Sequence, residues 1–193
     1  MKTKLGPQTM LFPMPAVLIG TYTEDGRPNA MTAAWSAICC MKPICAGVAV
    51  RDVRMTFDNI TRAGAFTINV PRATQAAEVD YLGIVSGAKV PDKMEVAGME
   101  CEKGAEVDAP ILTSCPVNLE CQLVERTELG THTWFVGEVV EVHVDDDLVG
   151  DKGKLDIAAL DPLIYVTNSS EYRRLGEVVG KAYSIGKTLK KGN

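Results

Sequence analysis

The sequence predicts a mainly β fold, an antiparallel β-barrel with a few flanking helices. Candidate strands outnumber candidate helices, and they follow one another at short spacing with turn residues between them. No Gly-x-Gly-x-x-Gly pattern follows a strand and no Gly-Lys-Ser/Thr loop occurs, so neither a Rossmann nor a P-loop architecture is indicated. At 193 residues, the chain is expected to form one domain over residues 1–193.

The first part of the chain is predicted to supply four strands. Residues 16–22 are rich in β-favouring side chains, and residues 24–28 carry the Asp-Gly signal of a hairpin turn. Residues 29–36 are expected to form a strand of mainly small side chains. Residues 44–50 and 65–70 are apolar runs of strand length, each bounded by proline or glycine, and we expect both to be strands.

Two helices are predicted between and after these strands. Asp52 is expected to be the N-cap of the first helix, which ends near Gly64. The apolar residues at helical spacing in it are Val53, Phe57 and Ile60. Residues 73–85 form the second candidate helix, which Gly83 and Gly87 weaken, and these glycines are expected to mark its end.

The second part of the chain begins with its least regular stretch, residues 86–110. A loop this long in a compact domain is usually functional or mobile. Lys93 lies in its middle and is either a solvated surface lysine or a ligand contact brought in by the loop. Residues 116–125 and 131–144 alternate as half-buried strands do, and residues 126–130 are expected to form the turn between them.

A flat ligand with a phosphate is one interpretation of the strand around Trp35 and the helix after it. Small side chains allow a flat ring to approach the backbone. The small residues beside Trp35 are Thr32, Ala33, Ala34 and Ser36. Arg51, Arg54 and Thr56 would supply two cations and a hydroxyl where a strand ends and a helix begins, which suits a phosphate. The alternative is a tightly packed strand and two solvated arginines, and the local chemistry leaves both open.

Composition and motifs exclude several other classes. A formal net charge of -5 argues against non-specific nucleic-acid binding, which needs a basic face. With two histidines and no Gly-x-Ser-x-Gly elbow, hydrolysis by a nucleophilic triad is not indicated. The apolar run at residues 10–20 is interrupted by prolines and too short to span a bilayer, so we expect an entering strand and no membrane contact.

The six cysteines indicate neither a metal site nor a disulfide framework. No Cys-x-x-Cys pair occurs, and no metal site is expected. Cys39 and Cys40 would point to opposite faces of a strand and are badly placed to bridge each other. The cysteines are expected to be reduced and packed as small apolar residues in a cytoplasmic protein.

Several separated stretches of the chain resemble one family. They are PNAMTAAWSAICCMKP at 28–43, RDVRMTFDNITRAGAFTINVP at 51–71, GEVVEVHVD at 137–145 and LDPLIYVTNSSEYRRLGE at 160–177. In order and spacing they are similar to the flavin reductase domain of the FMN-binding split-barrel type, and within it to the flavoredoxins. This resemblance covers nearly the whole chain. It implies a six-stranded antiparallel Greek-key barrel with flanking helices, and a homodimer with the flavin near its interface.

The resemblance also assigns residues to the flavin. Trp35 would lie against the ring, which would be lined by Thr32, Ala33, Ser36, Val50 and Arg51. Polar contacts, including those to phosphate, would come from Asn29, Thr56, Lys93 and His132. Tyr165 sits where the family has an aromatic residue near the isoalloxazine. The family's usual Pro-Pro after the small-residue strand is Lys42-Pro43-Ile44 in this chain, a departure from the pattern.

Three functions are compatible with these features. The first is an NAD(P)H-dependent flavin reductase that binds FMN, with NADH or NADPH as electron donor. The second is a non-enzymatic carrier of the flavoredoxin type, whose tightly bound FMN exchanges electrons with a redox partner protein. The third is a barrel that has lost its flavin and only dimerises. Because the flavin would carry the chemistry, no catalytic side chain is expected.

Overall fold

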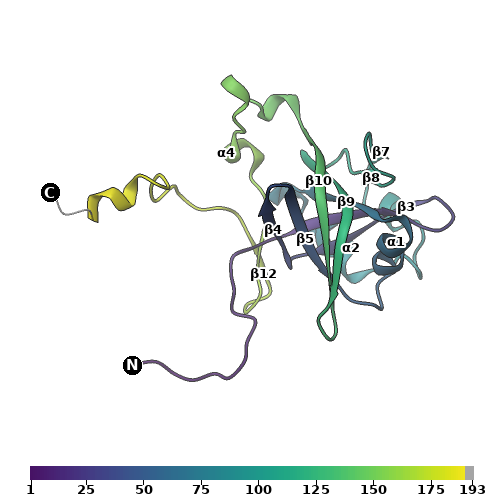
Figure 1. The fold of residues 1–193 in the computed structure, drawn as a ribbon, viewed down its shortest axis with the longest axis horizontal. Coiled ribbons are helices and arrows are strands. Elements are labelled where there is room, and N and C mark those ends of the chain that lie inside the picture. The colour runs from purple at the N-terminus through teal and green to yellow at the C-terminus, as the bar shows by residue number, and fades with distance from the viewer. Residues whose placement is uncertain (190–193) are drawn as a thin grey trace.

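The structure is a computed structural model that describes residues 1–189, so residues 190–193 of the expected domain lie outside the described residues. At its centre is a seven-stranded antiparallel sheet in the order β3-β2-β6-β9-β10-β5-β4 (Figure 1). The strands are β2 (Val17–Tyr22), β3 (Pro28–Ala33), β4 (Ser36–Met41), β5 (Ile44–Val50), β6 (Ala65–Val70), β9 (Val117–Glu128) and β10 (Thr133–Val144).

The six strands from β3 to β5 in this order form the predicted Greek-key barrel, and β4 continues the sheet beyond β5. The two ends of the barrel meet where the Ala49 N–H, on β5, donates to the Trp35 carbonyl just after β3, at 2.9 Å. The chain passes from β5 to the non-adjacent β6 through α1 (Met55–Ala63), which gives the crossover of a Greek key. A split barrel with flanking helices is therefore confirmed.

Short elements surround the barrel. The remaining helices are η1 (Ala73–Gln75), α2 (Ala76–Ile84), α3 (Lys93–Val96), η2 (Asp146–Leu148), η3 (Asp151–Gly153), α4 (Ile157–Leu160) and η4 (Ile185–Leu189). A small sheet joins β1 (Met14–Pro15), β11 (Ile164–Val166) and β12 (Glu171–Arg173), and β7 (Glu102–Lys103) pairs with β8 (Pro110–Ile111). In Figure 1 both terminal segments extend away from the barrel.

The two faces of β2 pack into two different cores, because successive side chains of a strand point to opposite faces. Val17 and Ile19 lie in the barrel interior with Phe66 and Phe135, and Ile60 of α1 closes that cluster. On the other face, the second cluster contains Ala16, Leu18, Ala30, Val79, Leu82, Met94, Met99, Leu112, Cys115 and Leu163. This second core fixes α2 and α3 against the outside of β2 and β3.

Several sequence predictions match the structure residue for residue. The strands expected at 44–50 and 65–70 are β5 and β6. Gly64 has φ 63° in the left-handed region and ends α1, as its position after a helical pattern indicates. The helix predicted at 73–85 is η1 followed by α2, which runs through Gly83 to Ile84 with Val85 as its C-cap.

The predicted N-cap of the first helix is wrong. The helix begins at Met55, and Arg54 occupies the N-cap position without a side-chain capping bond. The reason is a turn before the helix, in which the Arg54 N–H donates to the Arg51 carbonyl at 3.0 Å. Asp52 lies within this turn and is exposed.

The strand predicted at 29–36 is two strands separated by a bend. β3 ends at Ala33 and β4 begins at Ser36, whose N–H donates to the Ala34 carbonyl at 3.0 Å. This tight reversal leaves the Trp35 carbonyl free to accept from Ala49. The chain therefore leaves one edge of the barrel and joins the outer side of β5 within two residues.

The turn predicted at 126–130 lies further along, because β9 extends to Glu128 and β10 begins only at Thr133. Residues 126–128 remain in the ladder, opposite Phe135, Trp134 and Thr133. The turn is closed by the Leu129 N–H, which donates to the His132 carbonyl at 2.7 Å. The irregular region 86–110 is only partly a loop, since it contains α3 and β7.

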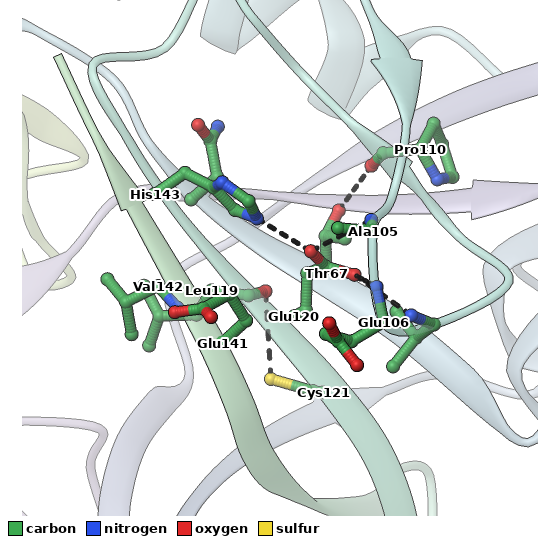
Figure 2. Close-up of polar contacts among 12 residues, drawn as sticks. Thr67, Ala105, Glu106, Pro110, Leu119, Glu120, Cys121, Glu141, Val142 and His143 are labelled. Carbon is green, nitrogen blue, oxygen red and sulfur yellow. Dashed lines mark hydrogen bonds and ion pairs between the residues drawn. The ribbon is translucent and has the colours of Figure 1, made fainter.

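Buried polar side chains on the outer face of β6 and β9 hold residues 104–112 against the sheet. Thr67 donates to the Pro110 carbonyl at 2.6 Å, and Asn118 donates to the Leu112 carbonyl at 2.9 Å (Figure 2 shows the Thr67 bond). Asn69 accepts from the Leu112 N–H at 3.1 Å and from Asn118 at 2.8 Å. The excursion between α3 and β9 is thus anchored by specific hydrogen bonds.

Glu120 of β9 is the charged member of this network and is 0% exposed. Its carboxylate accepts from the backbone N–H groups of Ala105, Glu106 and Val107 at 3.0, 2.8 and 2.9 Å. His143 Nε2 lies 2.6 Å from Oε1, as Figure 2 shows. Burial acts to raise the pKa of Glu120, but the bonds from His143 and the three N–H groups outweigh it and hold the pKa below its ordinary value.

We expect Glu120→Gln to lower the free energy of unfolding by about 1–3 kcal/mol near neutral pH, since it leaves a buried N–H donor facing an amide N–H₂. The lowered folded-state pKa means that the stabilisation is present above the unfolded value of 4.5 and is lost as the pH falls through the folded pKa. Urea unfolding at neutral and strongly acidic pH measures both values. Glu141→Gln, at an exposed position on β10, is the control. A deficit that does not shrink in acid would contradict this role.

Candidate functional site

The bend between β3 and β4 places Trp35 at the surface, where its side chain is 39% exposed. His132, from the turn between β9 and β10, packs on it with ring centroids 4.6 Å apart and planes inclined at 43°. Burial, followed by the nearby Arg51 charge, lowers the pKa of His132, so the imidazole is neutral at neutral pH. The two rings form one wall of a shallow pocket.

This ring pocket has a volume of about 150 Å³ and a wall of small residues. It is lined by Met31, Thr32, Ala33, Ala34, Trp35, Ala49, Arg51, Arg54 and His132. The pocket therefore combines small side chains, two aromatic rings and two guanidinium groups. A flat apolar ring with an anionic substituent matches this combination of shape and charge.

A second, smaller hollow adjoins the ring pocket, with which it shares Met31 and Arg54. The other residues that line it are Asn29, Met55, Thr56, Val85, Ser86, Gly87 and Lys93. Its polar side chains are two cations, two hydroxyls and one amide, and no carboxylate lines it. The backbone of Gly87 approaches closely, because a Cβ there would lie 2.5 Å from Asn29 Oδ1. We call this hollow the anion pocket.

Lys93 is the buried cation of the anion pocket and is only 3% exposed. Its Nζ donates to the carbonyls of Leu82 and Val85 at 3.3 and 3.2 Å, which are free carbonyls at the C-terminal end of α2. Burial, with a smaller effect from Arg54, lowers the pKa of Lys93 to about 8. A buried cation with only carbonyl partners is stabilised by an anion, so the donor side chains of this pocket suit a phosphate group.

A third pocket of about 270 Å³ lies on the other side of Thr32 and Ala34. Its remaining lining residues are Ala16, Asp80, Gly83, Ile84, Tyr165, Ser170 and Tyr172. The rings of Tyr165 and Tyr172 are 5.7 Å apart, and the Tyr172 hydroxyl donates to Asp80 Oδ1 at 3.1 Å. Since this pocket shares two residues with the ring pocket, the same stretch of backbone is accessible from two sides.

The structure brings together most of the residues that the sequence singled out. Thr32, Ala33, Trp35, Arg51 and His132 line the ring pocket. Asn29, Thr56 and Lys93 line the anion pocket, where Asn29 Nδ2 is 3.4 Å from Thr56 Oγ1. Tyr165 lines the third pocket.

Ser36 and Val50 do not line these pockets with their side chains. The Ser36 hydroxyl donates to the Gly47 carbonyl at 2.9 Å, and Val50 is 1% exposed in the barrel core. Lys93 was expected in an irregular loop, but it opens the short helix α3 and is buried. The reason is apolar packing, because Met94 lies in the outer core cluster with Ala30 and Leu82, and α3 packs on β3.

Some residues that line the pockets are not among those that the resemblance assigns to the flavin. They are Met31, Ala34, Ala49, Arg54, Ser86 and Gly87. Ala34 and Arg54 belong to patterns that the sequence already displays, the small-residue stretch and the cation pair. The Ser86-Gly87 pair directly after a helix was the available signal for the close backbone approach.

Residues 1–189, the part of the chain that the structure describes, also bear on metal binding and membrane crossing. No group of three or more His, Cys, Asp or Glu side chains is placed to hold a metal ion in that part of the chain. None of its helices is both long enough and apolar enough to cross a membrane.

This fold and site define a split barrel of the flavin reductase-like class. The family model of the flavin reductase like domain matches residues 9–176, and the chain therefore belongs to this family. Among solved structures, flavoredoxin of Desulfovibrio vulgaris (Miyazaki F) is 41% identical, with a TM-score of 0.91 over 96% of this chain and 100% of that one.

Two further similarities are more distant. An FMN-binding protein from Thermus thermophilus, solved with bound 1-cyclohex-2-enone, is 25% identical with a TM-score of 0.78, over 94% of this chain and 98% of that one. A ferric-chelate reductase (NAD(P)H) of Archaeoglobus fulgidus is 28% identical over 67% of this chain and 75% of that relative. These similarities and the family membership indicate a flavin-dependent electron-transfer protein.

Proposed function

We propose that the protein binds FMN non-covalently and, as a flavin reductase, takes electrons for it from NADH or NADPH. The observation that carries this proposal is the anion pocket, with its buried Lys93, directly beside the ring pocket at Trp35. FMN consists of a flat ring joined by a short chain to one phosphate that bears close to two negative charges. The ferric-chelate reductase (NAD(P)H) among the relatives supports the choice of donor.

The compact anion pocket favours FMN over FAD. Asn29, Gly87 and Lys93 line a hollow of only about 10 Å³, so it offers room for no more than one terminal group. FAD would have to carry a second phosphate and an adenosine beyond this point. The FMN-binding protein of T. thermophilus supports the same assignment.

When bound, FMN supplies reversible hydride and single-electron transfer. The protein's own task is binding and orientation. Residues 32–34 line the ring pocket with small side chains, Trp35 and His132 form a wall, and Arg51 and Arg54 add positive charge. Positive charge that is fixed before the reaction favours any negative charge that develops on the ligand. No side chain is required to move a proton.

Lys93→Met is expected to weaken FMN binding by about 10- to 100-fold, because it removes a charge-assisted hydrogen bond worth about 1.5–3 kcal/mol. Methionine keeps an unbranched apolar stem in the buried site. Lys89→Met, at an exposed position in the same segment, is the matched control. Titration of FMN and FAD into the apo-proteins, followed by flavin fluorescence, gives the affinities. Circular dichroism must show that each variant is folded, and equal FMN affinities of Lys93→Met and Lys89→Met would refute the phosphate site.

A second function is supported by the similarity to flavoredoxin at 41% identity. In this alternative the protein is a carrier that keeps FMN bound and exchanges electrons with a redox partner protein. The wall of Trp35 and His132 is exposed enough to let electrons pass to a docked protein without a nicotinamide site. The two functions differ in the source of the electrons and in nothing else that concerns FMN binding.

Anaerobic mixing of the FMN-loaded protein with NADH or NADPH separates these two functions. As a reductase, the protein is expected to lose its flavin absorbance near 450 nm within the time of several turnovers, roughly seconds for an ordinary enzyme. A spectrum that stays unchanged with both nucleotides, but bleaches with dithionite, would overturn the reductase and favour the carrier. Failure to bind FMN at all would leave only the barrel that has lost its flavin.

We also propose a homodimer. The terminal segments that extend from the barrel in Figure 1 carry exposed apolar side chains, among them Leu11, Phe12, Val178, Val179 and Tyr183. Burying such arms against a second copy removes apolar surface from water. Light scattering at micromolar concentration is expected to give twice the chain mass of 20.8 kDa. A species of 20.8 kDa under these conditions would contradict the proposal.

We propose the cytoplasm as the location of the protein. The six cysteines are free thiols in the structure, and persistent thiols are typical of a reducing compartment. NADH and NADPH, the proposed donors, suit the same place.

A further inference from the structure

The hairpin of β4 and β5 carries three thiols close to its turn: Cys39, Cys40 and Cys45. Cys40 and Cys45 are direct partners in the antiparallel ladder, next to the last pair, Met41 and Ile44. From the sequence, the cysteines are expected to be packed as small apolar residues. That holds for Cys45, which is 6% exposed, but Cys39 and Cys40 are exposed.

Ladder geometry makes Cys40 and Cys45 a candidate pair for covalent linkage. Directly opposed residues of an antiparallel pair have Cα atoms about 4.5 or 5.5 Å apart, with side chains on the same face. Disulfides accept Cα separations of about 4.4–6.8 Å, so both kinds of pair lie within the range. Burial, followed by the neighbouring Cys40 and Cys39 thiols, raises the pKa of Cys45, which agrees with the closeness that the ladder register gives this pair.

Cys39 occupies a different position, because the ladder has a bulge between Ile38 and Cys40 and Cys39 has no partner opposite it. Its Sγ lies 3.5 Å from the Cys45 carbonyl, a contact with backbone. Two of the other cysteines, Cys115 and Cys121, are set apart from exchange chemistry. Burial raises the pKa of the Cys115 and Cys121 thiols to about 12, and neither is exposed.

Clustered thiols can also bind a soft metal ion. Within residues 1–189, however, no three side chains of the metal-binding types are arranged to hold one. One exposed and one buried thiol on directly opposed ladder residues instead match the division between an attacking and a resolving cysteine.

We propose that Cys40 and Cys45 form a dithiol–disulfide site that exchanges with low-molecular-weight disulfides of the glutathione type. The site is independent of the proposed FMN function. It adds a transient two-electron redox modification, the kind of disulfide that occurs in reducing compartments. It lies on the hairpin whose far ends carry Trp35 and Arg51 (β4 and β5 in Figure 1).

The exchange has two balanced steps. The exposed Cys40 thiolate attacks one sulfur of the external disulfide, whose S–S bond breaks, and the departing thiolate takes up a proton. Cys45 then loses its proton and attacks Cys40 Sγ, the mixed disulfide breaks, and a second external thiol leaves. The protein dithiol is oxidised by two electrons and the external disulfide is reduced to two thiols.

The test uses the full chain with and without bound FMN. The reduced protein is incubated with oxidised glutathione, remaining thiols are alkylated, and intact mass and peptide mapping follow. We expect loss of the mass of two hydrogen atoms, a link between Cys40 and Cys45, and full recovery with dithiothreitol. Cys39→Ser is expected to keep the link, which distinguishes Cys40 from its neighbour, whereas Cys40→Ser and Cys45→Ala are expected to abolish it.

Three results would overturn the proposal. They are an unchanged mass, a glutathione adduct that never resolves into an internal disulfide, and a link that disappears in Cys39→Ser. Cys40→Ser changes an exposed position and so keeps the test valid if Cys45→Ala fails to fold. Flavin absorbance of the loaded protein is expected to be the same in all variants. Its absence in the wild type would speak against FMN binding without bearing on the thiols.

Discussion

The closure of the barrel at Trp35 and Ala49 is the constraint on which the site depends. The end strands β3 and β5 are not paired along their length, and the backbone bond between the Ala49 N–H and the Trp35 carbonyl joins them. To reach this point the chain must bend sharply after Ala33, and the bend directs the indole outward. The same closure brings Arg51, at the end of β5, beside the small residues of the bend. The ring pocket is therefore a consequence of how the barrel closes.

The anion pocket depends on a second set of constraints, which lie in α3 and in the excursion between α3 and β9. Met94 and Met99 fix the start of the excursion through the outer core. Thr67, Asn118 and Glu120 fix its later part through hydrogen bonds to backbone groups that would otherwise be unpaired. Because buried polar groups are costly when unsatisfied, this network allows few alternative placements. Lys93 therefore approaches β3 and α1 from a segment anchored at both ends.

The sequence predicted those features that local patterns determine. The strands at 44–50 and 65–70 are bounded by proline or glycine and apolar throughout, and Gly64 offers the left-handed conformation that ends a helix. Local pattern could not show that residues 51–54 form a turn, because the Asp52 side chain satisfies the usual capping preference. It also could not show that Lys93 is buried, since the packing of α3 on β3 joins residues distant in sequence.

For the site residues, the limit of prediction is the difference between being near the ligand in sequence and facing it in space. Ser36 and Val50 lie in the right strands, but the alternation of side chains turns Val50 into the barrel and Gly47 engages the Ser36 hydroxyl. Arg54 lines both pockets although it is only one of two arginines in a turn. Which arginine lines both pockets depends on the direction of the turn before α1, and composition does not encode that direction.

The electrostatics of the two pockets couple the protonation of Lys93 to the binding of an anionic ligand. The pKa of Lys93 is lowered to about 8 by burial and by Arg54, so the folded protein holds this charge at a cost. A phosphate dianion in the anion pocket favours the charged form of Lys93 and so reverses the shift. Phosphate binding and protonation of Lys93 then favour each other. The affinity for a phosphate ligand therefore falls as the pH rises above the pKa of Lys93 in the free protein. Two nearby cations that repel each other in the free protein are, for the same reason, arranged in advance for an anionic ligand.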